Sequence, residues 1–385
     1  MAEKDHAQVA PLEGVRVVDF SRVLAGPLAT MVLGDLGADV IKVERPGEGD
    51  DTRQWGPPFV GDDAAYFLSL NRNKRSVELD LGSAEGALAA RKLCLRADVV
   101  IENFRPGLMM KFGLDYESLA AENPRLVYCS LTAFGDDEEA AKRPGYDIIV
   151  QAVSGLMSIT GEREGNPVKV GVALLDVITG LYASTGILAE LRARDATGRG
   201  QRVSISLFDA SVAALVNQAA NHLMGGLVPG PMGTGHPNIV PYQVFHASDR
   251  QFVLAAGNDR FFERTCEVIG RPELAADPGF ATNGDRVKNR DTLIPILKEV
   301  FATKLRDEWL RLLEKAGVPC APVRTLDEVF ASPEGARLIQ EVDDPVRGLL
   351  KLVASPIKLS GESPAVRLPP PRLGEHNDEV LGPGE

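Results

Sequence analysis

The stretch GVRVVDFSRVLAGPLATMVLGDLGADVIKVE, residues 14–44, decides the fold class. Residues 15–20 form an apolar run typical of a buried strand, and residues 38–44 form a second one. Between them, residues 25–36 favour a helix that ends near a glycine. A strand, a helix and a strand of these lengths predict a βαβ unit with two parallel strands.

The same alternation continues along the chain. Further strands are expected at 75–81, 98–104, 125–131 and 203–209. The expected helices lie at 84–96, near 106–112 and 115–122, from just after Asp176 to about Asp195, and from the end of the strand 203–209 to about Met224. Strands that alternate with helices predict an α/β fold, in which helices cover both faces of a mainly parallel sheet.

A second domain is expected after Gly225–Asn238, which is rich in glycine and proline and marks a boundary. Beyond it, QVFHAS and QFVLAAG predict a hairpin, and helices dominate to about Ala316. The proline-rich end of the chain is expected to wrap back over another part. We therefore expect a large domain at 1–224, a small domain at 225–325, and a linker and C-terminal segment at 326–385.

Composition narrows the function. The chain has 385 residues, 44% of them hydrophobic, and a net charge of −12 with a pI near 5.1, which disfavours nucleic-acid binding. Four separated cysteines predict free thiols, and the five histidines lack metal-ligand spacing, so no metal site is expected. No run approaches the roughly 18 apolar residues of a membrane span. We expect a cytoplasmic protein without a membrane partner.

Asp176 is the leading catalytic candidate. It follows the apolar run Val170–Leu175 and precedes a helical run. This placement predicts a helix N-cap at the carboxyl end of a strand, where the helix dipole and N–H donors keep the carboxylate ionised. An ionised carboxylate can attack an activated acyl group, whereas the alternative role is capping alone.

Across nearly its whole length, the chain resembles the family III CoA-transferases of the CaiB/BaiF type. This family includes formyl-CoA and carnitine-CoA transferases and the α-methylacyl-CoA racemases. The matching motifs include PLEGVRVVDFSRVLAGP (11–27), ADVVIENFRPG (97–107), RPGYDIIVQAVSGLMSITG (143–161), GVALLDVITGLYA (171–183) and LGEHNDEVL (373–381). The resemblance implies a Rossmann-like large domain, a smaller α+β domain and an interlocked homodimer.

The resemblance also implies the reaction. Asp176 would be the nucleophile that carries CoA from an acyl-CoA donor, expected to be succinyl-CoA, to a small carboxylic acid through an aspartyl intermediate. Acyl-CoA would be a co-substrate, and no tightly bound cofactor is expected. The implied CoA contacts are Arg22, Val23, Leu24, Ala25, Arg45, Asn103, Phe104, Arg105, Lys111 and Tyr146.

Several of these assignments keep alternatives. Tyr146 occupies the position of the racemases' catalytic histidine, and a neutral tyrosine is a poor base, so transfer is favoured over racemase or epimerase activity. Phe104 could equally be core, and the cluster Asn71–Arg75 could bind phosphate or pair with carboxylates. Gly233, Gly235 and His236 lie where the transferases carry a glycine-rich loop, but this loop is short and lacks the GGGG run of the formyl-CoA transferases. His236 either binds an acceptor carboxylate or is structural.

Overall fold

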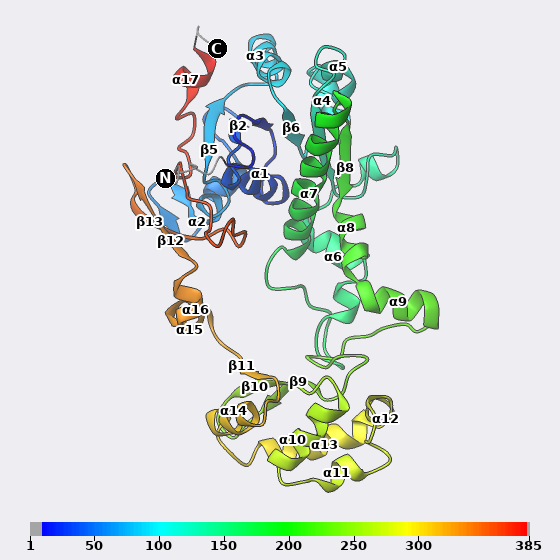
Figure 1. Ribbon diagram of the computed structural model, residues 1–385. Coiled ribbons are helices and arrows are strands. Elements are labelled where there is room, and N and C mark those ends of the chain that lie inside the picture. Colours follow the sequence, from blue (N-terminus) through cyan, green and yellow to red (C-terminus); the bar gives the residue numbers. More distant parts are fainter. Residues whose placement is uncertain (1–9, 383–385) are drawn as a thin grey trace, which may run out of the picture. The chain divides into compact units, whose positions relative to one another are not determined.

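The computed structural model describes residues 10–382, which divide into two compact units. The first comprises the described residues up to Leu156, Val170–Gly225, and the described residues from Arg337 onward. The second comprises Met157–Lys169 and Gly226–Ala336. Figure 1 shows the elements of both units, and each unit is described in turn.

A parallel sheet of six strands forms the centre of the first unit. Its order is β5-β2-β1-β6-β7-β8, and every neighbouring pair is parallel. The strands are β1 (Arg16–Asp19), β2 (Asp39–Glu44), β5 (Lys74–Glu78), β6 (Val99–Glu102), β7 (Val127–Thr132) and β8 (Arg202–Ser206). From β1 the chain adds β2 and β5 on one side of the sheet, and it then returns to add β6, β7 and β8 on the other side. The position between β1 and β6 is the switch point at which open α/β folds bind their ligands.

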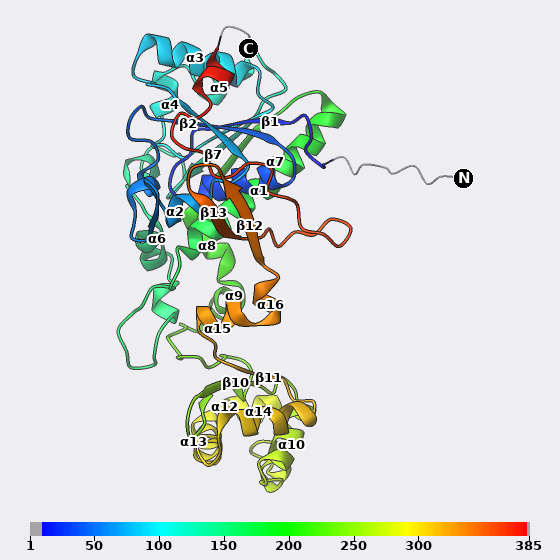
Figure 2. The same cartoon turned by 90° about the vertical axis from the view of Figure 1, so that its left-hand side faces the viewer.

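Helices cover both faces of this sheet, as Figure 2 shows. Val18 points to one face and packs with α3, α5 and α17, whereas Val17 points to the other and packs with α1 and α7. The bounds are α1 (Ala25–Asp35), α3 (Ala84–Leu95), α5 (Tyr116–Ala120), α7 (Leu174–Thr197) and α17 (Asn377–Leu381). The two-sided α/β architecture expected from the alternating pattern is confirmed.

The helix α7 packs unusually close to α1. A Cβ atom added to Gly180 would lie 2.5 Å from the Ala25 carbonyl oxygen, so glycine permits this approach. Within residues 10–382, α7 is the one helix long and apolar enough to cross a membrane. Its Ala183, Ile187 and Leu191 instead belong to the core between α1 and the sheet.

Both ends of the chain build the first unit. The hairpin of β12 (Ile339–Asp344) and β13 (Gly348–Val353) is followed by a segment in which Arg367 donates to the Gly34 carbonyl at 2.7 Å. The His376 N–H donates to the Ser76 carbonyl at 3.0 Å, which places α17 beside β5. The smaller elements of this unit are β3 (Phe59–Val60), β4 (Asp63–Ala64), α2 (Ala65–Leu68), α4 (Leu108–Lys111), α6 (Asp147–Val153), α8 (Leu207–Ala214) and α9 (Val216–Gly225).

The second unit has an antiparallel sheet β11-β10-β9 and its own aromatic core. The expected hairpin is confirmed as β9 (Tyr242–His246) and β10 (Gln251–Ala255), and β11 (Cys320–Pro322) adds a third strand. The helices are α10 (Asp259–Val268), α11 (Glu273–Ala276), α12 (Asn283–Lys288), α13 (Arg290–Phe301), α14 (Arg306–Lys315), α15 (Leu326–Ala331) and α16 (Pro333–Ala336).

Some boundaries differ from the expected ones. The strand expected at 203–209 ends at Ser206, whose hydroxyl accepts from the Asp209 N–H at 3.0 Å and so caps α8. The second unit takes residues 157–169 and extends to Ala336. The domain bounds 1–224, 225–325 and 326–385 stay a prediction, because compact units need not coincide with domains.

Candidate active site

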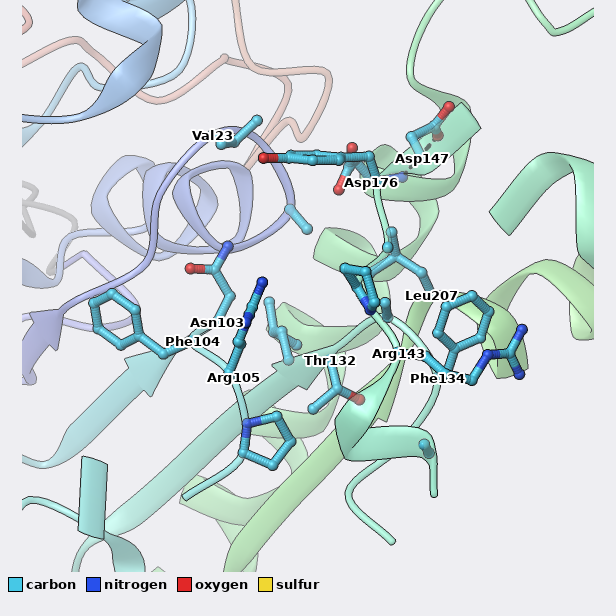
Figure 3. A pocket seen from close by; sticks show the side chains of 18 of the residues that line it. Val23, Asn103, Phe104, Arg105, Thr132, Phe134, Arg143, Asp147, Asp176 and Leu207 are labelled. Carbon is cyan, nitrogen blue, oxygen red and sulfur yellow. Dashed lines mark hydrogen bonds between the residues drawn. The ribbon is translucent and has the colours of Figure 1, made fainter. Parts of the chain in front are cut away.

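A cavity of about 250 Å³ opens at the switch point of the sheet. Figure 3 shows Asn103, Phe104 and Arg105, from the loop after β6, among the residues that line this cavity, together with Asp147 and Asp176. The loop after β1 contributes Arg22 and Val23, and the first residue of α1 contributes Ala25. Further lining residues include Thr132, Phe134, Arg143, Tyr146 and Leu207. The cavity thus joins Asp176 to most of the residues expected to bind CoA.

The loops after β1 and β6 are tied together by Asn103. Its side-chain oxygen accepts from the Arg22 N–H at 2.9 Å, and its amide donates to the Arg22 carbonyl at 2.8 Å. Val23 has a φ of 71°, a left-handed conformation that costs a β-branched residue about 1–3 kcal/mol. Its N–H donates to the Asp50 carboxylate at 3.2 Å, which helps to hold this conformation.

Asp50 is in turn held ionised by Lys42. Burial opposes ionisation, but the Lys42 ammonium, 2.9 Å away, and the Thr52 N–H outweigh it and lower the pKa of Asp50 to about 2. Both side chains are buried. The backbone of the loop after β1 is therefore held in place by a buried ion pair.

Asp176 does not cap α7, contrary to the sequence prediction. The helix begins at Leu174, its N-cap is Ala173, and Asp176 lies in the first turn. Residues 170–173 form no strand. An apolar run of this length is typical of a buried strand, but here the run lies at the surface, where Val172 is exposed.

The expected ionised state of Asp176 also needs correction. Burial, followed by the negative charge of Asp147, raises the pKa of Asp176 to about 7. The positive end of α7 does not offset these two effects. The carboxyl group is thus about half ionised at neutral pH and more basic than an ordinary aspartate.

Three arginines line the cavity. Arg22, 39% exposed, pairs with Asp51 at 3.2 Å and lies 5.4 Å from the centre of the Phe104 ring. Arg143 lies 3.9 Å from the centre of the Phe134 ring. Within residues 10–382, neither Arg105 nor Arg143 has a carboxylate partner in an ion pair, which leaves positive charge available to an anionic ligand.

The remaining predicted CoA residues lie elsewhere or face differently. Leu24 is buried in a small core cluster, and Lys111 is exposed at the end of α4. Arg45 pairs with Glu48 at 2.5 Å and lines a second cavity of about 230 Å³. That cavity also includes Arg22 and Phe104, so the two cavities share these residues. Phe104 lines both, although it also packs against the core.

The basic cluster Asn71–Arg75 has a structural role in this fold. Arg72 pairs with buried Asp35 at 2.6 Å, and Lys74 lies 3.3 Å from Asp19. Burial lowers the pKa of Lys74 to about 8 against the pull of Asp19. These side chains pair with carboxylates and do not line the cavity that contains Asp176.

The glycine-containing loop belongs to the second unit. The His236 Nδ1 accepts from the Asn238 N–H at 3.0 Å, and Arg290 donates to the His236 carbonyl at 3.1 Å. Burial and the charge of Arg290 lower the pKa of His236. Gly233 has a φ of 60° and donates its N–H to the Gly161 carbonyl at 2.8 Å. The role of His236 toward an acceptor stays a prediction.

The sequence did not single out Arg143, Thr132 or Gln151. Arg143 is the first residue of the RPGYD motif, and a single arginine in a sequence gives no local sign that it lines a cavity. Thr132 ends β7, where a strand-end rule could have found it. Within the described residues, no group of three His, Cys, Asp or Glu side chains is arranged to hold a metal ion.

Comparison with known proteins supplies the family. The model of CoA-transferase family III matches residues 12–377. The chain is 43% identical to human succinyl-CoA:glutarate CoA-transferase, covering 98% of this chain and 87% of that protein, and 44% identical to succinate–glutarate CoA-transferase of Agrobacterium fabrum, covering 96% and 95%.

A solved structure gives the same result. The crystal structure of a CAIB/BAIF family protein from Brucella suis superimposes with a TM-score of 0.85 at 45% identity, covering 97% of this chain and 98% of that one. The sequence resemblance is therefore confirmed over the two described units. The chain belongs to CoA-transferase family III.

Proposed function

We propose that this protein transfers CoA from succinyl-CoA to a small dicarboxylic acid, with Asp176 as the covalent carrier. As a family III member, the chain is an acyl-CoA:carboxylate CoA-transferase. Relatives at 43% and 44% identity are named for succinyl-CoA or succinate and for glutarate. The observation that carries the proposal is the position of Asp176 in a cavity that also presents Arg105 and Arg143, two arginines without a carboxylate partner within residues 10–382.

The chemistry requires two exchanges at one carboxylate. The Asp176 carboxylate attacks the thioester carbonyl, which forms a mixed anhydride and releases the CoA thiolate. The thiolate then attacks the Asp176 carbonyl carbon, which forms an aspartyl-CoA thioester and releases succinate. The acceptor carboxylate attacks this thioester, which forms a second mixed anhydride and again releases the CoA thiolate. The thiolate then attacks the acyl carbon of the acceptor, which forms the new acyl-CoA and frees the Asp176 carboxylate. Each step replaces one bond between an acyl carbon and oxygen or sulfur with another such bond, so no step consumes water.

The raised pKa of Asp176 suits this role. A carboxylate with a pKa of about 7 is a stronger nucleophile than one near 3.8, and about half of it is ionised at neutral pH. Turnover should therefore increase as the pH rises toward 7 and then level off. The arginines at the cavity would stabilise the negative charge of the attacked acyl group.

The two neighbouring cavities suggest how CoA lies. The second cavity has an apolar lining from Leu79, Leu108 and Phe112, and Arg45 at its edge. We place the adenine there and the diphosphate at Arg22 and Arg105, which leaves the thioester free to reach Asp176. Arg45 would then contact the adenine end, while Leu24 and Lys111 would contribute through backbone position or surface charge.

A homodimer is part of the proposal. Within the described residues, α9 buries none of its side chains, and Leu223 and Met224 are 81% and 89% exposed. Leu181 and Tyr182 of α7 are also half exposed. Apolar side chains in these numbers favour burial against a second copy. Light scattering should give a dimer, and Met224→Lys should weaken it; a monomeric wild type would contradict the proposal.

The reaction is tested by incubation with succinyl-CoA and a panel of carboxylic acids, followed by mass spectrometry of the CoA esters. We expect new dicarboxyl-CoA masses, and borohydride during turnover should reduce the Asp176 acyl group to an alcohol. Asp176→Ala should lose transfer while CoA binding persists. Deuterium exchange at the α-carbon without an acceptor would favour the racemase alternative instead. A cytoplasmic location stays a prediction.

A further inference from the structure

The segment that leads into Asp176 has no side chain that caps the start of α7. Residues 170–173 have no regular structure, and the N-cap Ala173 has no side chain that can accept a hydrogen bond. The first N–H groups of a helix have no partners within the helix and need an acceptor from elsewhere. The start of α7 therefore depends on another part of the chain.

Asp147 supplies that acceptor from α6. Its Oδ2 atom accepts from the Leu175 N–H at 2.8 Å and from the Asp176 N–H at 3.4 Å. The side chain is buried and lines the same cavity as Asp176. Figure 3 shows both side chains at the same end of the cavity. A carboxylate so placed fixes the backbone of the reacting residue and interacts favourably with the positive end of α7.

Gln151 holds the other end of the same segment. It follows Asp147 by one helical turn and is fully buried. Its amide donates to the Asp147 Oδ1 at 2.5 Å, and its oxygen accepts from the Val170 N–H at 3.0 Å. One side of α6 thus contacts the segment at Val170 and again at Leu175. A displacement of the reacting carboxylate by even one ångström reduces the rate of the reaction strongly.

We infer that Asp147 and Gln151 form a positioning pair that fixes Val170–Asp176 at both ends and keeps one negative charge beside Asp176. The inference rests on the proposed role of Asp176 as carrier. The pair divides two tasks between its members. Gln151 is neutral and acts through geometry alone, whereas Asp147 acts through both geometry and charge.

The surroundings of Asp176 identify which charges matter. Asp147 on α6 is the charge that raises the pKa of Asp176 after burial, to about 7. From α2, Tyr66 faces the same region, since burial and then the charges of Asp176, Asp147 and Asp50 raise its pKa. Tyr66 therefore stays protonated and contributes no charge. The other charged or titratable residues of the cavity are Arg22, Asp51, Arg105, Arg143 and Tyr146.

Two substitutions separate the tasks. Asp147→Asn keeps the size of the side chain and an oxygen for the Leu175 N–H. It removes the charge, and it also loses the hydrogen bond from the Gln151 amide, because an NH2 group takes the place of Oδ1. The rise of kcat with pH should then move to lower pH by about one unit or more, because Asp176 ionises more easily. Gln151→Met keeps the charge of Asp147 and removes both hydrogen bonds. It should lower kcat about 10-fold or more without moving the pH profile.

The experiment measures kcat against pH, and the Kd for CoA by calorimetry, in the full-length enzyme. Asp115→Asn is the matched control, because Asp115 caps α5 by accepting from the Ser118 N–H at 3.1 Å. Both Asp147→Asn and Gln151→Met should bind CoA as the wild type does, and the control should keep its pH profile.

Two results would overturn the inference. One is an Asp147→Asn enzyme that binds CoA and has an unmoved pH profile. The other is loss of CoA binding in proportion to turnover in both variants, which indicates a general structural role. If Asp147→Asn does not fold, Gln151→Met and Asp147→Glu remain decisive, since each keeps the charge and should keep the profile while lowering kcat. Failure of borohydride to label Asp176 in the wild type would refute the carrier role instead.

Discussion

Replacing Asp176 with asparagine should stabilise the protein at alkaline pH although it abolishes transfer. The pKa of the carboxyl group is about 7 in the folded protein, against 3.8 for an ordinary aspartate, because of burial and then of Asp147. The folded state thus binds the proton more tightly than the unfolded state does. Stability from this group is fully present below pH 3.8 and is lost as the pH rises to about 7.

The magnitude follows from the shift. A difference of about three pKa units at 1.36 kcal/mol each gives about 4 kcal/mol as an upper limit. Asp176 is partly accessible to solvent, so screening reduces the value, and we expect about 1–2 kcal/mol. Asparagine does not ionise, and its advantage over the wild type should therefore grow with pH and reach its full size above pH 7.

The assay is urea unfolding of the wild type and Asp176→Asn at about pH 5 and about pH 8. The gap in unfolding free energy should widen at the higher pH. Asp115→Asn is a control in which the stability should change in the opposite direction. Burial opposes the ionisation of Asp115, but hydrogen bonds from Ser118 outweigh it and lower the pKa of this carboxyl group. The variant should therefore be less stable than the wild type at both pH values. Equal gaps for Asp176→Asn at both pH values would refute the assigned ionisation.

Three further predictions concern binding and packing. Arg105→Ala should raise the Kd for CoA about 10-fold in calorimetry, whereas Lys111→Ala, outside the cavity, should change it less; equal effects would contradict the placement of the diphosphate. Gly180→Val should destabilise the protein by about 1–3 kcal/mol in urea unfolding, because its side chain would meet the α1 backbone, while Gly257→Ala, with open space around it, should be neutral. Val23→Gly should change the unfolding free energy by less than about 1 kcal/mol in the same assay, since relief of the strain at a φ of 71° offsets the lost side-chain packing and the greater freedom of the unfolded chain; a much larger loss of stability would argue against that conformation.

Local patterns in the sequence determined the architecture. The apolar runs at 15–20 and 38–44 became β1 and β2, and the hairpin after the glycine-rich boundary became β9 and β10. Periodicity suffices here because a strand or an amphipathic helix shows its buried face within a few residues. The motifs around Asn103 and Asp176 also sufficed to identify the family.

Only the tertiary structure decided the electrostatic state of the site. Asp147 caps α7 from 29 residues away in sequence, and its charge, together with burial, sets the pKa of Asp176. Likewise the sequence left open whether the cluster Asn71–Arg75 binds phosphate or pairs with carboxylates, and in the fold Arg72 pairs with Asp35 at a separation of 37 residues. Burial and charge pairing depend on segments that meet only after folding, and no local pattern reports them.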